Sequence, residues 1–403
     1  MLLSSSLEGP SVEIGVNLSR FVSTSMNQIP ASNLSEFIKH NRLLLSCGGA
    51  AGVAAGFNAP IAGIFFALEV IQGTFTSESN TISSNTTPQV QTNGSDDSVI
   101  PNLNQLSLEA TNNNLISTKG GISSIVLSAV LAALISKTIL GDELVFKVNQ
   151  YVLATPLLEL PLYLLLGTLS GLVAFVFSRM SDSSKQIFSG TLGPEPLRNL
   201  MSSIPDVLKP VLGGLFCGIV GIYYPQILFF GYETLNNLLA KNSLSTELLV
   251  TLLAVKMLTT SVASGSGLVG GTFAPSLFFG GMLGAAFHNV FEFWFQSVGQ
   301  GLAEVPAYAM IGSASVLAAL FRAPLTASLL LFECTREYEI ILPLMASAGV
   351  ASVVADILDL RFTSPPPTLP IPPPTTIIPS SGNDNIVGLV DVPDTFITPS
   401  KGD

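Results

Sequence analysis

Two stretches of the chain, FNAPIAGIFFALEV at residues 57–70 and FRAPLTASLLLFEC at residues 321–334, are built to one pattern. Each has a Phe, an Ala-Pro pair and a Glu at the same spacing, so that Phe57, Ala59, Pro60 and Glu69 recur as Phe321, Ala323, Pro324 and Glu333. The segments before them also match, with GGAAGVAAG leading into the first Phe and GSASVLAAL into the second. Internal repeats interrupted by Gly and Pro inside apolar segments are typical of membrane transport proteins whose binding site lies between the repeats.

A second pair of motifs lies upstream at nearly the same offset. Glu8-Gly9-Pro10-Ser11 with Gly15 corresponds to Phe273-Ala274-Pro275-Ser276 with Gly280. Pro is favoured in the first turn of a helix, so we expect helices to start at Glu8-Gly9-Pro10 and within Gly271-Thr272-Phe273-Ala274-Pro275. Two helix N-termini directed at one point near the bilayer midplane form an anion site without a full cationic side chain. The alternative is that both motifs are ordinary helix starts in packing contacts.

The composition indicates a membrane protein. The 403 residues are 48% hydrophobic and only 11% charged, against roughly 25% charged in soluble domains, and the mean hydropathy is +0.57. Apolar runs of helix length or near it occupy residues 121–140, 156–179, 209–230, 247–265, 273–290, 306–320 and 323–334. A straight span needs about 20 residues, and interrupted helices are tolerated only where protein or a water-filled cavity covers the freed backbone groups. We therefore predict an all-α, multi-pass integral membrane fold of tilted, partly re-entrant helices, rather than a soluble helical protein.

The same pattern predicts the domain organisation. First-half membrane helices, a truncated first repeat, occupy 1–71, and further membrane helices, including the second repeat at about 247–360, occupy 121–360. Between them, residues 72–120 are rich in Ser, Thr, Asn and Gln and are predicted to be a polar disordered loop. A Pro-rich tail at 361–403 is predicted to be extended or disordered.

Few residues in the chain support enzyme or metal chemistry. The two histidines, His40 and His288, and the three cysteines, Cys47, Cys217 and Cys334, show no zinc or catalytic-triad spacing. The net charge is −11 and no basic run occurs, which argues against a nucleic-acid partner. We expect no enzymatic activity, no metal and no cofactor.

The motifs together resemble one known family. SLEGPSVEIG is similar to the G-K/R-E-G-P motif of the CLC chloride channels and chloride/proton exchangers, and GGTFAPSLFFGGMLGAAF to that family's G-x-F-x-P motif and its helix. The two stretches that opened this section resemble the corresponding helix pairs of the family's two halves. The likeness runs from about Leu7 to about Leu358. It implies a CLC-type inverted-repeat bundle, a homodimer in which each subunit has its own pore, and membrane lipid and small anions as partners.

The resemblance also implies roles for individual residues. Glu8 matches the gating glutamate, whose carboxylate competes with the anion and leaves when it is protonated or displaced. Taken without the family match, Glu8 is an acid at a helix start, stabilised by the helix dipole. The anion-binding positions carried over are Gly9, Pro10, Gly271, Thr272, Phe273 and Ala274, with backbone N–H groups supplied by Gly9, Thr272 and Phe273.

Three departures from the family pattern shape the expected function. Exchangers carry a second glutamate after the residue that matches Glu69, whereas this chain has Val70, as channel members do, and valine cannot relay a proton. Glu69 itself has the counterpart Glu333, so we expect it to be mainly structural; the alternative is that it substitutes for the missing glutamate in proton handling. Only seven residues precede Glu8, where the family has further helices, so the fold is expected to be incomplete at the N-terminus. The family's pore tyrosine also has no match after Leu360.

The sequence therefore favours a chloride-type anion channel. The alternatives are a proton-coupled anion exchanger and a truncated, non-conducting or regulatory subunit. By analogy with plant and algal family members, we expect an organellar membrane, of the plastid or the Golgi.

Overall fold

The repeated motifs fold into the same helix pair, in the same register. Helix α3 (Asn41–Phe57) and helix α13 (Val305–Phe321) have 17 residues each and end at the Phe of the motif. After a two-residue link, helix α4 (Pro60–Phe66) and helix α14 (Pro324–Thr335) both begin at the Pro of the motif. Pro suits a first turn because its missing N–H is one that has no partner within the helix.

The links between these helices repeat at the level of backbone angles. Asn58 and Arg322 are both left-handed, with φ of 53° and 55°, a conformation that is uncommon for residues other than Gly. The next residues are Ala59, with φ −128° and ψ 77°, and Ala323, with φ −134° and ψ 72°. The two halves of the chain therefore share a backbone path as well as a sequence pattern.

The upstream motifs also open equivalent helices. Helix α1 (Glu8–Met26) begins at Glu8 and helix α12 (Phe273–Gln296) begins at Phe273, so Pro10 and Pro275 are each the third residue of their helix. Both helix starts expected from the sequence are confirmed at these residues.

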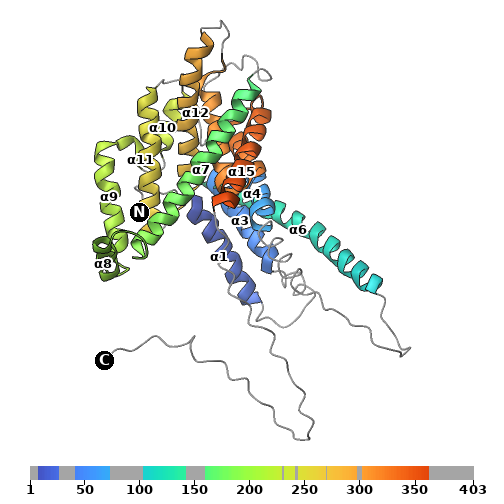
Figure 1. Cartoon of the computed structure of the whole chain (residues 1–403). Helices are drawn as coiled ribbons and strands as arrows, with labels where there is room; N and C mark the ends of the chain where they lie inside the picture. Colours follow the sequence, from blue (N-terminus) through green and yellow to red (C-terminus); the bar gives the residue numbers. More distant parts are fainter. Residues whose placement is uncertain are drawn as a thin grey trace, which may run out of the picture. The chain divides into compact units, whose positions relative to one another are not determined.

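The computed structural model describes residues 8–26, 41–72, 103–141, 159–228, 231–240, 244–268, 270–296 and 302–362. In these ranges the chain forms helices joined by turns and coil, without a β-strand, which confirms the all-α prediction. Figure 1 shows the arrangement. The remaining helices are η1 (Ala67–Gln72, a π-helix), α6 (Leu103–Leu140), α7 (Leu160–Phe188), α8 (Glu195–Ser203), α9 (Lys209–Tyr223), η2 (Pro225–Ile227, a 3₁₀ turn), α10 (Tyr232–Leu239), α11 (Thr246–Gly265) and α15 (Ile341–Phe362).

Within the described ranges, four helical segments are long and apolar enough to cross a membrane. They are Gly121–Ile139, Leu160–Phe188, Thr246–Gly265 and Ile341–Phe362. The apolar helices α3, α9, α13 and α14 are shorter, at 10–17 residues. Mixed full-length and short apolar helices confirm a multi-pass membrane fold with interrupted segments.

The largest difference from a predicted boundary lies at the start of α6, whereas η1 ends at Gln72 and α15 at Phe362, within two residues of the predicted boundaries. Helix α6 begins at Leu103, so residues 103–120, expected to belong to the polar loop, are helical. Polar Asn, Gln and Ser residues alternate there with Leu103, Leu106 and Leu108, and a long helix propagates at little cost once nucleated in its apolar half. The other parts of the predicted loop and tail, residues 73–102 and 363–403, lie outside the described residues.

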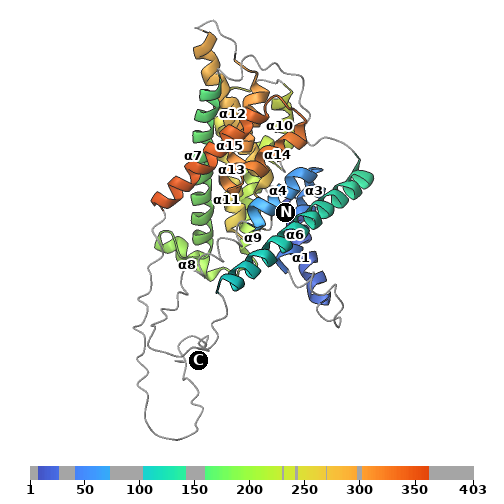
Figure 2. The same ribbon diagram turned by 90° about the vertical axis from the view of Figure 1, so that its right-hand side faces the viewer.

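The core is centred on α13. Fourteen of its residues are buried, and it contacts α7, α12, α14 and α15, which surround it in Figure 2. Two pairs of glycines let helices approach closely at equivalent places. A Cβ on Gly15 would lie 2.2 Å from the carbonyl oxygen of Gly48, and a Cβ on Gly280 would lie 2.1 Å from that of Gly312. The α1–α3 and α12–α13 contacts are thus two copies of one packing arrangement.

Candidate functional site

The two helices that open at the upstream motifs contact one another. These helices, α1 and α12, extend in opposite directions (Figure 1). The first N–H groups of any helix have no partner within it, and they carry the positive end of the helix dipole. The predicted anion-binding segments, Gly9-Pro10 and Gly271–Ala274, therefore lie at the starts of two contacting helices from opposite halves.

The start of α12 is defined by a short set of contacts. The carbonyl of Thr272 accepts the N–H of Ser276 at 3.0 Å, which closes the first turn. Pro275 has no N–H, so the donors left at this end belong to residues just before it. Gly271 and Thr272 are half-buried, whereas Phe273 and Ala274 are buried. The four predicted residues thus lie consecutively in a protected helix start.

An aromatic cluster holds this helix start against both repeats. The ring of Phe273 lies 5.6 Å from that of Phe57, 6.0 Å from Phe66 and 4.2 Å from Phe321, measured between centroids. Phe57 and Phe321 are the equivalent aromatic residues of the two repeats, so one side chain of α12 contacts both. The sequence marked these two phenylalanines by their repetition but gave no indication of their shared partner.

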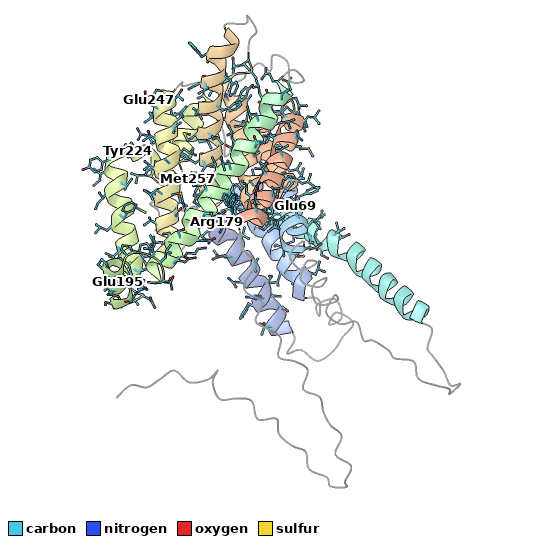
Figure 3. The ribbon with its side chains drawn as sticks, in the orientation of Figure 1. Glu69, Arg179, Glu195, Tyr224, Glu247 and Met257 are labelled. Carbon is cyan, nitrogen blue, oxygen red and sulfur yellow. The ribbon has the colours of Figure 1, made fainter. Side chains whose placement is uncertain are left out.

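The repeated glutamates cap each other's helix pair. The carboxylate of Glu333 accepts the N–H groups of Ile61 at 3.0 Å and Ala62 at 2.7 Å, in the first turn of α4. The carboxylate of Glu69 accepts the N–H of Leu325 at 3.2 Å and, at 2.8 Å each, the N–H and hydroxyl of Thr326, in the first turn of α14. Figure 3 labels Glu69 where α4 approaches the second repeat. The crossed pair supports the expected structural role of Glu69 and extends it to Glu333.

Val70 lies next to this cap in the π-helix η1. Its side chain is half-buried and packs against the main apolar core. The equivalent residue of the second repeat, Cys334, lies in the regular helix α14. The two halves therefore differ in helix type at the position that would match the family's second glutamate. A π-helix is rare and is frequently found at functional sites.

Glu8 is the first residue of α1. Its side chain, like the surroundings of Gly9, lies outside the described part of the structure, so the gating role remains a prediction.

Among the described residues, two buried charged side chains were not anticipated. Lys256, in the middle of α11, is completely buried, donates to the carbonyl of Ile227 at 2.7 Å and lies 5.9 Å from the ring centroid of Phe278. The sequence did contain a sign of this buried charge, since Lys256 is a lone Lys in the apolar run 247–265 and ionisable residues at membrane depth are rare.

The other buried charge is Glu159, just before α7. Its carboxylate accepts the hydroxyls of Tyr163 at 2.7 Å and Tyr308 at 2.9 Å and the N–H of Ala303 at 3.0 Å. It thus ties the start of α7 to α13. Within the described residues, no group of three or more His, Cys, Asp and Glu side chains is arranged to hold a metal ion.

Comparisons with known proteins agree with this architecture. The family model described as voltage gated chloride channel matches residues 3–85 and 107–356. The chain is 37% identical to chloride channel protein CLC-e and 33% identical to CLC-f, both of Arabidopsis thaliana, over 86% and 87% of its own length. These matches span only 43% and 39% of the plant proteins. It is also 28% identical to the H⁺/Cl⁻ exchange transporter ClcA of Cronobacter sakazakii, over 87% of this chain and 62% of that one.

Solved structures show the same fold. A slow cyanobacterial Cl⁻/H⁺ antiporter superposes with a TM-score of 0.62 and 25% identity, covering 89% of this chain and 69% of the antiporter. A CLC-type fluoride/proton antiporter superposes with a TM-score of 0.60 and 19% identity, covering 88% and 71%. The repeated helix pairs, the contacting helices α1 and α12 and the match over most of the chain together establish that this protein belongs to the CLC family of voltage-gated chloride channels and related anion transporters.

Proposed function

We propose that the protein is a channel for chloride or a similar small anion, which passes the starts of α1 and α12. The observation that carries this proposal is that two helices from inverted halves begin at equivalent residues and contact one another. Backbone N–H groups and helix dipoles attract an anion. Because no full cationic charge is needed, the anion also leaves easily, as conduction requires.

Val70 supports a channel over an exchanger. A coupled exchanger needs a protonatable group on the route to the inner side, and the hydrocarbon side chain of Val70 cannot carry a proton. The relatives include both kinds by name, chloride channel proteins and H⁺/Cl⁻ exchange transporters. A proton-coupled exchanger is therefore the alternative function.

The remaining parts of the proposal follow the family. The protein acts as a homodimer in the bilayer, with the transported anion as its ligand, no cofactor and no enzymatic activity. We propose an organellar membrane, of the plastid or the Golgi, as its location.

The experiment is chloride efflux from liposomes reconstituted with the protein, with chloride and pH electrodes in the same bath and protein-free liposomes as the control. Chloride efflux without proton movement supports the channel. Opposed proton flux in a fixed ratio to chloride favours the exchanger. Absence of flux from folded protein contradicts both and favours a non-conducting subunit.

A further inference from the structure

Ser276, the fourth residue of α12, is bonded through two of its groups to the start of its own helix. Its backbone N–H donates to the carbonyl of Thr272 at 3.0 Å, and its hydroxyl donates to the carbonyl of Phe273 at 2.5 Å. The residue is completely buried, so water does not compete for these bonds. One residue thus holds two consecutive carbonyls of the predicted anion-binding segment Gly271–Ala274.

Each of these carbonyls shares a rigid peptide unit with an N–H group. The peptide bond is planar and trans, so the carbonyl of one residue and the N–H of the next lie in one plane and point in opposite directions. The carbonyl of Thr272 is therefore joined to the N–H of Phe273, and the carbonyl of Phe273 to the N–H of Ala274. These two N–H groups open the helix and have no acceptor within it. Holding the two carbonyls fixes the direction of both donors.

The hydroxyl bond also strengthens the donor at the other side of the peptide unit. Hydrogen bonds that follow one another through polar groups polarise each other, by about 10–30% per bond. In an α-helix the carbonyl of Phe273 accepts the N–H of Leu277, four residues on. The hydroxyl of Ser276 is thus a second bond to this carbonyl, which helix geometry alone does not require.

The first repeat uses its equivalent serine differently. Ser11 corresponds to Ser276, but its hydroxyl donates to the carbonyl of Gly52 on α3 at 3.1 Å and so joins two helices. In the second half that joining bond comes from Ser313 on α13, whose hydroxyl donates to the carbonyl of Leu277 at 2.8 Å. A hydroxyl has one proton to donate. The serine after the motif proline therefore acts between helices in the first half and on the helix start itself in the second.

We propose that Ser276 is a positioning residue of the anion pathway, which holds and polarises the N–H groups of Phe273 and Ala274 toward the anion. This inference rests on the proposed function, because it requires an anion at the start of α12. The hydroxyl proton of Ser276 is bonded to the carbonyl of Phe273, so the residue acts on the anion through the peptide units.

The test is calorimetric titration of sodium chloride into the full chain, purified in detergent and chloride-free buffer, with thermal unfolding measured in the same buffer. We expect Ser276→Ala to bind chloride about threefold more weakly, because the N–H donors lose orientation and polarisation. Its apparent melting temperature should stay close to that of the wild type, since alanine favours a helix. Ser276→Thr, which keeps the hydroxyl, should bind chloride more tightly than Ser276→Ala.

Ser313→Ala is the matched control. It also removes a buried hydroxyl that donates to a carbonyl of α12, but the peptide unit concerned has its N–H bonded inside the helix. We expect its chloride affinity to equal that of the wild type.

The outcomes separate three cases. Unchanged chloride affinity in Ser276→Ala with a lower melting temperature would make the serine purely structural. Equal loss of affinity in Ser313→Ala, or equal affinity of the alanine and threonine variants at equal melting temperatures, would also contradict the positioning role. Absence of chloride binding in the folded wild type would instead overturn the proposed function, and the role of Ser276 with it.

Discussion

At the scale of single residues, Glu8 is the position on which the proposed gating depends. It is the first residue of α1, and under the proposed mechanism its carboxylate would compete with a bound anion for the same N–H donors. Replacing it by glutamine keeps the size of the side chain but removes its charge and its response to protons. We expect Glu8→Gln to conduct chloride and to lose most of the pH dependence of the flux. Liposome efflux measured across a pH series checks this, and unchanged pH dependence in the variant would exclude Glu8 as the gate.

Glu333 is a residue whose role is structural and equally specific. Its two oxygens accept two N–H groups of α4, whereas a glutamine amide offers one accepting oxygen. Glu333→Gln therefore leaves one of these donors unpaired, which costs about 1–3 kcal/mol. We expect a lower apparent melting temperature and faster hydrogen exchange in the first turn of α4. The control is Glu339→Gln, at an exposed glutamate between α14 and α15, and an equal effect there would contradict the crossed cap.

At the scale of helices, the close contact of α12 with α13 is set by glycine. A Cβ on Gly280 would lie 2.1 Å from the carbonyl oxygen of Gly312, and this neighbour is backbone that cannot rotate away. Gly280→Ala must therefore push the two helices apart, at a cost of about 3 kcal/mol, the upper part of the range for overpacking. The same shift would move the start of α12, so we expect reduced chloride flux as well as reduced stability.

Gly349 supplies the matched control for this prediction. It lies in helix α15 with no atom within 4 Å of an added Cβ. Gly349→Ala should be neutral, or stabilising by about 0.5–1 kcal/mol, since alanine favours helix interiors. Apparent melting temperatures of the two variants in detergent distinguish the contact from a general effect of adding a methyl group. Equal stability of both variants would show that the helices adapt to the extra atom.

At the scale of the whole molecule, the repeat predicted much of the fold. The matching positions of Phe57 and Phe321 and of Pro60 and Pro324 were enough to predict two equivalent helix pairs. Pro favours a helix start through its own backbone geometry, which does not depend on distant contacts. The crossed caps could not be predicted in this way. Glu69 accepts hydrogen bonds from residues at least 256 positions away in the chain, and Glu333 from residues at least 271 positions away. The spacing of residues along the chain does not show that the glutamate of each repeat caps a helix of the other repeat.

Buried charge was the other part that the sequence left open. Lys256 and Glu159 find their partners, Ile227 and the tyrosines 163 and 308, only through the packing of separate helices. Residues 103–120 were wrongly predicted to be a polar loop. Their polar composition indicates contact with solvent, but it does not reveal that the neighbouring apolar helix continues through them. Local patterns therefore predicted where helices begin, and tertiary contacts determined what each polar group does.

The location of the pathway within one subunit gives the last prediction. Helices α1 and α12 belong to one chain and contact one another, so each member of the proposed homodimer should contain a complete pathway. In liposomes with mixtures of wild-type and Glu8→Gln chains, the pH-sensitive part of the chloride flux should then fall in direct proportion to the wild-type fraction. A pathway shared between two subunits would need two wild-type chains, and the pH-sensitive part would follow the square of that fraction. Efflux at a series of mixing ratios separates the two curves most clearly at equal amounts, where the expected values are about one half and one quarter of the wild-type response.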